Sequence, residues 1–303
     1  MKKTLLVMTL VALCSCGFLE STMAQHSKNR SMSISTDGDD KVITDCGQIR
    51  IRIDKNDAIR SEQMQSLPGS AISLLQVRPP HNGGIQVQGW DRNEYEIKAC
   101  LAAGGDSAEA KALLDRVKLS IQDGQVRVVG ANPEDWVAFL VIQVPRGAAL
   151  DLSSQNGPIG VNGVSGNVQA RAVNGPITFR DVTGTVKADV QNGPITVVGS
   201  GGDFRLSAQN GPMTVELLGS QWMSGDLEGH TQNGPLTLLV PESYQSSVRV
   251  DASKHSPVQC KASQYREAVR TWDNPSRIQF GGSEPVVRLS TVNGPVTITS
   301  AKN

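Results

Sequence analysis

The chain contains four histidines, His26, His81, His230 and His255, the residue type most often used for metal binding and acid–base catalysis. None of them has a histidine or cysteine partner at a spacing typical of a zinc site. The motifs of serine hydrolases, zinc proteases and P-loop nucleotide-binding proteins do not occur either. The sequence therefore predicts no metal, no cofactor and no catalytic residue.

Carboxylates could still act in polysaccharide cleavage, which needs two of them close together on one face. The acidic residues expected to point outward are sparse, and Asp189 is flanked in its column by arginine and serine. The best local cluster is Asp226 and Glu228, near Trp222 in the segment 219–225. An aromatic ring beside two carboxylates is a candidate glycan-binding platform; the alternative is a tryptophan that packs its own loop.

A second candidate binding region is the segment 242–282, which carries Tyr265, Arg270 and Trp272. Aromatic and arginine side chains supply much of the binding energy at protein interfaces. In repeat proteins, function often lies in such insertions. The alternative is a flap that packs over the last repeats.

An internal repeat predicts the elements that position these residues. Asn-Gly-Pro followed by an apolar residue recurs, with the first four copies 18 residues apart, and two weaker copies come earlier. The predicted structural corners are Asn82, Asp123, Asn156, Asn174, Asn192, Asn210, Asn233 and Asn293.

Apolar and polar residues alternate on both sides of each corner. Val186, Ala188 and Val190 precede one corner at every second position, and Ile195 and Val197 follow it. Alternation with a period of two predicts a strand with one buried face. Each repeat is therefore predicted to be a strand, a corner, a second strand and a Gly-rich turn.

The corner itself differs from a hairpin. Asn-Gly between strands usually forms a tight hairpin, but proline follows the glycine in six of the eight copies and has no N–H to close one. We expect the glycine to supply a positive φ while the proline prevents the chain from folding back. Equivalent positions would then stack in adjacent coils, with the asparagines as an amide ladder.

This pattern predicts an all-β protein, a β-solenoid of about 18-residue coils that stabilise one another. The alternative is an antiparallel meander or sandwich. The repeat domain is predicted over residues 41–303, with insertions at 104–117, 219–225 and 242–282. Within the first insertion, a capping residue followed by apolar residues at helical spacing predicts one short helix that covers a face or an end.

Residues 1–24 are predicted to be a signal peptide, because Lys2 and Lys3 precede an apolar run too short to span a bilayer. The alternative is a lipoprotein signal that ends at residue 15, with Cys16 as the lipidated residue. Residues 25–40 are polar and are predicted to form a tether. We expect an exported protein in the periplasm, at the outer membrane or at the cell surface, with membrane contact only through an N-terminal lipid.

Three cysteines, Cys46, Cys100 and Cys260, remain after removal of the leader. An oxidising compartment allows one disulfide among them and leaves one thiol over, and all three pairings stay open. The chain has 29 basic and 29 acidic residues, so its formal charge is zero. That balance removes the electrostatic basis for nucleic-acid binding.

The repeats resemble the DUF4097 putative-adhesin family of bacterial envelope proteins. The resemblance extends from an entry segment at 84–92 to the closing segment at 289–296, and covers the chain roughly from residue 45 to its end. It implies a right-handed, β-helix-like fold and an exported location, and it carries no catalytic residues.

We therefore predict a non-enzymatic, exported envelope protein that acts as an adhesive or structural interaction module. Its partner would be an envelope or surface ligand, a glycan or a protein, bound with help from multivalency. One alternative is a polysaccharide-cleaving enzyme on a β-helix scaffold. Another is a scaffold that stacks end to end in the envelope.

Overall fold

The computed structural model describes residues 32–36, 42–253, 256–262, 269–271, 276–282, 284 and 286–301. This part of the chain is mostly β-strand, as predicted, with one α-helix and two short 3₁₀ helices, Cys46–Gln48 and Gly69–Ala71. Its strands form a 12-stranded sheet, an 11-stranded sheet and a three-stranded sheet. The predicted leader and Cys16 lie outside the described residues.

Elements before the repeats form the small sheet and one end of both large sheets. The small antiparallel sheet contains β1 (Met32–Thr36), β2 (Ile49–Ile53) and β3 (Asn56–Asp57). The next elements are β4 (Ile59–Pro68), β5 (Leu75–Val77), β6 (Ile85–Trp90), β7 (Glu94–Ala103), α1 (Ser107–Leu114), β8 (Lys118–Gln122), β9 (Gln125–Val129) and β10 (Trp136–Pro145).

Strand β1 lies inside the segment 25–40, so the tether prediction does not hold for Met32–Thr36. These five residues pair antiparallel with β2 along its whole length. The segment alternates apolar and polar residues over too short a span to stand out in a polar stretch. Only the partner strand makes it recognisable.

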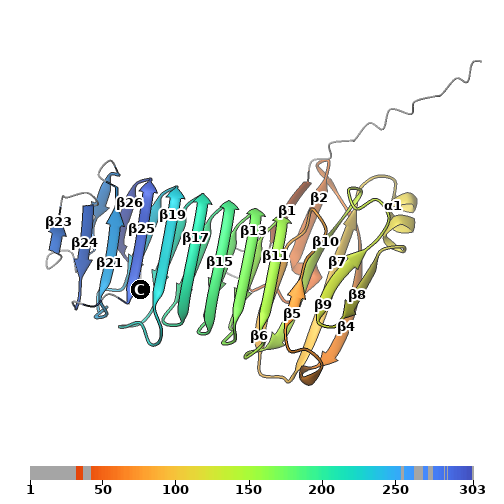
Figure 1. Ribbon diagram of the computed structural model, residues 1–303. Helices are drawn as coiled ribbons and strands as arrows, with labels where there is room; N and C mark the ends of the chain where they lie inside the picture. The colour runs from red at the N-terminus through yellow and green to blue at the C-terminus, as the bar shows by residue number, and fades with distance from the viewer. Residues whose placement is uncertain are drawn as a thin grey trace, which may run out of the picture. The chain divides into compact units, whose positions relative to one another are not determined.

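Each repeat contributes one strand to each large sheet. The 12-stranded sheet receives β11 (Leu150–Asn156), β13 (Val168–Asn174), β15 (Thr185–Asn192), β17 (Asp203–Asn210), β19 (Leu227–Asn233) and β25 (Val287–Asn293). The 11-stranded sheet receives β12 (Ile159–Asn162), β14 (Ile177–Arg180), β16 (Ile195–Gly199), β18 (Met213–Leu217), β20 (Leu236–Val240) and β26 (Val296–Ser300). Figure 1 shows β11 to β25 of the larger sheet side by side.

Neighbouring repeats pair in parallel and in register. Val186 on β15 lies opposite Val168 on β13 and Phe204 on β17, and the other sheet keeps the same register. An antiparallel meander therefore does not describe these strands. Parallel register keeps each apolar residue beside its counterpart in the next repeat, which is why a period of two in the sequence produces one continuous buried surface.

The corner asparagines form a ladder of side-chain amides. Asn174 Nδ2 donates to Asn156 Oδ1 over 2.9 Å, and Asn192 Nδ2 donates to Asn174 Oδ1 over 2.9 Å. The ladder continues through Asn210, Asn233 and Asn293 with donor–acceptor distances of 3.1, 3.0 and 2.9 Å. Each inner amide thus donates to one neighbour and accepts from the other, so the ladder adds side-chain hydrogen bonds to the backbone pairing.

The corner glycines meet a second requirement besides the predicted positive φ. Gly175 and Gly193 have the positive φ that the sequence predicted, at 157° and 153°. A Cβ on Gly193 would lie 2.3 Å from the carbonyl oxygen of Gly175 in the preceding repeat, and the equivalent clash occurs at every Asn-Gly-Pro corner. The absence of a side chain lets the backbones of successive repeats approach closely at the corner.

Of the two weaker corner copies, the one at Asp123 departs from this pattern and the one at Asn82 follows it. Asp123 and Gly124 have φ angles of 48° and 75° and join β8 to β9 as an antiparallel hairpin, so the corner prediction is wrong at Asp123. The reason is the next residue, Gln125, which keeps the N–H that proline lacks. Asn82 does stack beside Asn156, with 3.4 Å between Oδ1 of Asn82 and Nδ2 of Asn156.

The order of repeats in the sheets departs from chain order at both ends. The segment after β20 supplies β21 (Val248–Ala252), β22 (Val258–Cys260), β23 (Val269–Thr271) and β24 (Ser276–Phe280). Strand β25 then inserts between β19 and β21, and β26 inserts between β20 and β22. At the other end, β5 lies between β9 and β11, and β6 lies between β10 and β12.

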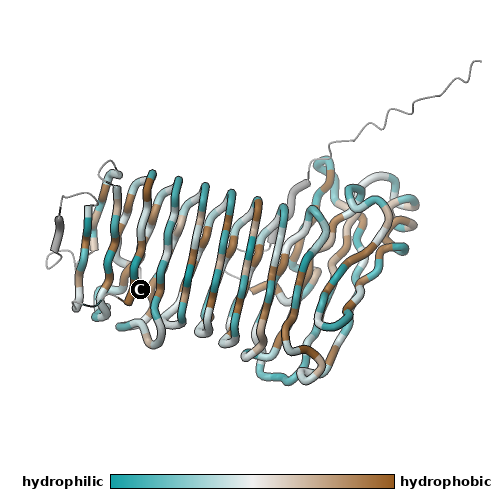
Figure 2. The backbone as a smooth tube through the Cα atoms, in the orientation of Figure 1, coloured by the Kyte–Doolittle hydropathy of each residue, from teal (hydrophilic) through white to brown (hydrophobic). Residues whose placement is uncertain are grey.

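The core lies between the two large sheets as one continuous cluster of buried residues from both. Hydrophobic and hydrophilic residues alternate along the strands, as Figure 2 shows. Phe179 and Phe204 meet edge to face at 6.0 Å between ring centroids, and Trp222 stacks against Phe204 in the same way at 5.9 Å. These three rings fill the interior beside a column otherwise made of aliphatic side chains.

The predicted short helix is present as α1, and Asp106 caps it by accepting a hydrogen bond from the Ala108 N–H over 2.9 Å. Ala110 and Leu114 form its buried side.

The Gln63 side chain of β4 accepts from the Leu119 N–H and donates to the Val117 carbonyl. This pairing occupies backbone groups at the start of the edge strand β8 and just before it, which would otherwise be available to another strand.

A disulfide joins Cys46 to Cys100 and so attaches the chain before β2 to strand β7. The structure thus has one of the three pairings that the sequence left open. The third cysteine, Cys260, lies half-buried on β22. The disulfide stands beside a second apolar cluster, in which Ile49, Ile51 and Ile53 pack on β7 and β10. Within the described residues, no helix is long and apolar enough to cross a membrane.

Candidate functional site

The outer face of the 12-stranded sheet carries the side chains that lie between the buried positions of each strand. Because neighbouring repeats are in register, these side chains form columns that run across the strands. We call the column next to the corner asparagines the glutamine column; it contains Gln155, Val173, Gln191, Gln209, Gln232 and Val292. The middle column, two residues further from the corner, contains Ser153, Arg171, Asp189, Ser207, His230 and Ser290.

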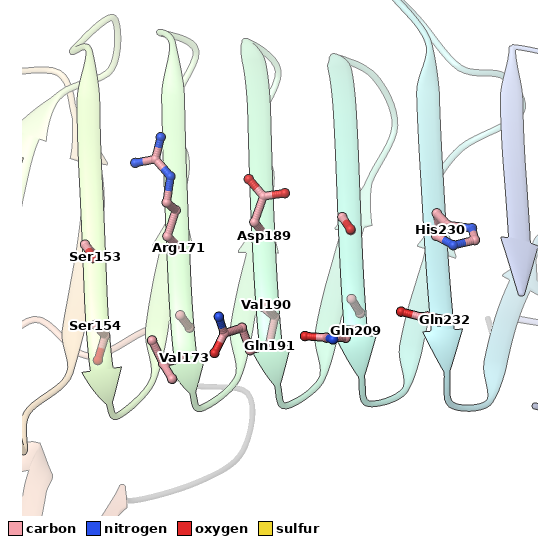
Figure 3. A pocket seen from close by; sticks show the side chains of 13 residues that line it. Ser153, Ser154, Arg171, Val173, Asp189, Val190, Gln191, Gln209, His230 and Gln232 are labelled. Atoms are coloured by element: carbon pink, nitrogen blue, oxygen red, sulfur yellow. The ribbon is translucent and has the colours of Figure 1, made fainter. Parts of the chain in front are cut away.

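Residues of these two columns on β11, β13, β15, β17 and β19 line a shallow hollow of about 490 Å³. Figure 3 shows Arg171, Asp189 and His230 in one row, with Gln191, Gln209 and Gln232 in a second row nearer the corners. The amides of the glutamine column are exposed to solvent. The hollow therefore presents donors and acceptors at a regular interval of one strand spacing, about 4.8 Å.

A second hollow of about 420 Å³ continues from the first, and Asp189, Ser207 and His230 line both. Its other side is formed by the outer column, two residues further from the corners than the middle column, which contains Lys187, Arg205, Glu228 and Arg288. We call the two hollows together the polar groove. His230 stands at their junction, where its Nδ1 lies 3.0 Å from Ser290 Oγ.

The outer column is a network of ion pairs. Arg288 Nη2 lies 2.7 Å from Asp226 Oδ2 and 2.8 Å from Glu228 Oε1, while Arg205 Nε lies 3.2 Å from Glu228 Oε2. The hydrogen bond with Asp226, followed by the one with Glu228, holds the pKa of Arg288 above its ordinary value. The predicted pair Asp226 and Glu228 is thus brought together, but by a shared guanidinium.

Trp222 does not join this pair on the surface. The side chain is only 7% exposed, and its indole Nε1 donates to the Gly202 carbonyl over 2.9 Å. The loop backbone is fixed as well, since the Trp222 N–H donates to Ser246 Oγ over 2.9 Å. Trp222 is therefore a buried packing residue, and the predicted glycan platform of Trp222 with Asp226 and Glu228 is not formed.

The other predicted binding residues belong to the segment 242–282. Arg270 lies on strand β23, whereas Tyr265 and Trp272 lie outside the described residues. The residues that sequence reasoning missed are Gln191, Gln209 and Gln232. Their position one residue before a corner asparagine repeats with the corners, so the sequence did indicate an exposed row of side chains. It did not indicate the hollow, because a hollow depends on the sizes of side chains in three adjacent columns.

Neither a protein-family model nor a curated protein matches the chain. Solved structures similar to it include a putative cell adhesion protein from Clostridium sporogenes ATCC 15579, 10% identical, with a TM-score of 0.35 over 80% of this chain and 100% of that one. A putative adhesin from Bacteroides fragilis NCTC 9343 is 8% identical, with a TM-score of 0.31 over 80% and 97%. A putative lipid binding protein from Parabacteroides distasonis ATCC 8503 is 12% identical, with a TM-score of 0.33 over 80% and 97%.

Proposed function

We propose that this protein is a non-enzymatic interaction module of the bacterial envelope that binds a hydroxyl-rich polymer along the polar groove. In this proposal the repeats form a β-solenoid, one coil per repeat, and the chain is exported and acts as an adhesin or envelope-binding protein. The resemblance of the Asn-Gly-Pro repeats to the DUF4097 family supports the location. The single observation that carries the ligand class is the exposed glutamine column along the hollow.

A glutamine side chain both donates and accepts hydrogen bonds, so a row of them can pair with hydroxyl groups in either orientation. The row crosses the strands, and a bound polymer would therefore lie across β13 to β19 rather than along one strand. Each contact with water-exposed groups contributes little, about 0.5–1.5 kcal/mol. Repetition of the same contact in successive repeats raises the total without a deep pocket.

The alternative of a polysaccharide-cleaving enzyme rests on the acidic pair. That mechanism requires one carboxyl group to donate a proton and the other to act as base or nucleophile. Here Asp226 and Glu228 both contact Arg288, and Glu228 also contacts Arg205. Oxygen atoms engaged by guanidinium groups are poorly placed for proton transfer to a substrate, so the geometry favours binding.

The test is a binding screen of the full chain against glycans and envelope polymers, with bound ligand and released products measured together. We expect binding without products. The double change Gln191→Ala and Gln209→Ala should weaken it by roughly tenfold, the equivalent of about 1.4 kcal/mol.

The matched control is Thr196→Ala with Thr214→Ala, on the outer face of the other sheet in the same repeats. This control should bind like the unchanged protein. Equal loss in both double variants would show that the groove is not the site. Release of shortened polymer would overturn the non-enzymatic proposal.

A further inference from the structure

A pocket of about 400 Å³ lies beside the small sheet and is lined mainly by polar atoms of β2 and the start of β4. Three of its lining residues are arginines, Arg50 and Arg52 on β2 and Arg60 on β4. One lining residue, Asp57, carries a negative charge. The lining therefore holds an excess of two positive charges, in a chain whose formal net charge is zero.

The alternation of β2 explains why the arginines face this pocket. Ile49, Ile51 and Ile53 are buried against β7 and β10, so Arg50 and Arg52 lie on the other face of β2. Ile49 and Ile51 also contribute to the lining of the pocket. The isoleucines belong to the apolar cluster that includes Phe139 and the disulfide residue Cys100. The strand that presents the arginines is thus anchored by its own buried face.

Two of the three guanidinium groups are held in place by neighbours. Arg60 Nη1 donates to the Ile49 carbonyl over 3.1 Å, and Arg52 Nε lies 3.2 Å from Asp57 Oδ1. Arg50 is exposed at the pocket. A guanidinium that uses one N–H on a backbone carbonyl keeps its remaining donors for a ligand, because it carries five.

We propose that this pocket binds a phosphate group, either on a small soluble molecule or on a lipid headgroup. Guanidinium groups match the oxygen geometry of phosphate with paired N–H donors, and several of them can serve one phosphate. The volume leaves room for the group that carries the phosphate. This site lies on a different sheet from the polar groove and does not depend on the proposed function.

The experiment measures pyrophosphate binding to the full chain by calorimetry at moderate ionic strength, followed by the variant Arg50→Gln. We expect saturable binding that Arg50→Gln weakens about tenfold, since a charge-assisted hydrogen bond is lost. Arg116→Gln, an exposed arginine after α1, is the matched control and should leave binding unchanged. Thermal unfolding of each variant shows that the fold is intact.

A second arm separates the two sources of phosphate. The full chain is sedimented with phosphatidylcholine vesicles, with and without phosphatidylglycerol. Binding of anionic vesicles that depends on Arg50, without pyrophosphate binding, supports the site and assigns it to lipid. Binding of neither probe, or binding that Arg50→Gln and Arg116→Gln reduce equally, overturns the proposal.

Discussion

Asn192 Nδ2 lies 2.9 Å from Asn174 Oδ1, and the two residues occupy the same position in successive repeats. The Asn192 side chain also accepts a hydrogen bond from Asn210 Nδ2 over 3.1 Å. One amide thus joins three repeats, and each link closes at a corner where the backbone turns from one sheet to the other. The ladder couples the repeats through side chains in addition to the backbone pairing.

Replacing Asn192 with alanine should lower the free energy of unfolding by about 1–2 kcal/mol, because two side-chain hydrogen bonds are lost. Urea unfolding followed by circular dichroism measures this. Gln191→Ala, at the neighbouring exposed position, is the control and should change stability by less than about 0.5 kcal/mol. Equal stability of Asn192→Ala and Gln191→Ala would show that the ladder contributes nothing.

Replacing Gly193 with alanine should be more damaging than the loss of the ladder amide. The new Cβ would lie 2.3 Å from the Gly175 carbonyl oxygen, so the repeats would have to separate at the corner. We expect a loss of about 1–3 kcal/mol, typical of overpacking, measured as a fall in the thermal unfolding midpoint.

The control for Gly193→Ala is Gly147→Ala. A Cβ at Gly147 meets nothing within 4 Å. That change should leave stability unchanged or raise it slightly, by about 0.4–1 kcal/mol, through the unfolded chain. A tolerated alanine at Gly193 would contradict the close-approach account of the corner.

The strands and the in-register stacking of neighbouring repeats could be predicted from the sequence because both depend on local pattern. Alternation around Asn192 determines the buried face, and the missing N–H of Pro194 excludes the tight hairpin. The sequence predicted the positive φ of Gly193, but not its close approach to the Gly175 carbonyl oxygen in the preceding repeat. Contacts of that kind appear only once the repeats are stacked.

The order of the repeats at the chain's end could not be predicted either. Asn293 follows Asn233 by 60 residues, yet its side chain donates directly to Asn233 Oδ1. The intervening segment forms β21 and β22 one position further out in the two large sheets, with β24 and then β23 beyond β21. The alternation of apolar and polar residues fits either β21 or β25 as the neighbour of β19. The sequence therefore does not distinguish this insertion from stacking in chain order.

Substitution of Trp222 tests whether this side chain stabilises the fold rather than binding the polymer. Trp222→Phe keeps an aromatic ring against Phe204 but removes the hydrogen bond to the Gly202 carbonyl. We expect a loss of about 1–2 kcal/mol in stability with polymer binding unchanged, measured by urea unfolding and by the binding screen. Loss of binding at full stability would place Trp222 in the site after all.

The Cys46–Cys100 disulfide closes a loop of 54 residues and should stabilise the fold by about 2–4 kcal/mol. The double change Cys46→Ser and Cys100→Ser should therefore lower the unfolding midpoint, and dithiothreitol should lower it for the unchanged protein but not for the double variant. Cys260→Ser is the control, and dithiothreitol should lower its unfolding midpoint as it does for the unchanged protein. A midpoint that dithiothreitol does not change would contradict the prediction.

Tyr244 should make the fold sensitive to alkaline pH. Burial raises the pKa of Tyr244 from 10.0 to about 12. Below pH 10 the phenol is protonated in both folded and unfolded chains, so stability is unaffected. Above pH 10 the unfolded chain ionises first, and stability falls by roughly 2–3 kcal/mol as the pH rises to about 12. Tyr244→Phe should flatten this decline, measured as the urea midpoint between pH 8 and 12, and an identical decline in Tyr244→Phe would assign it to other groups.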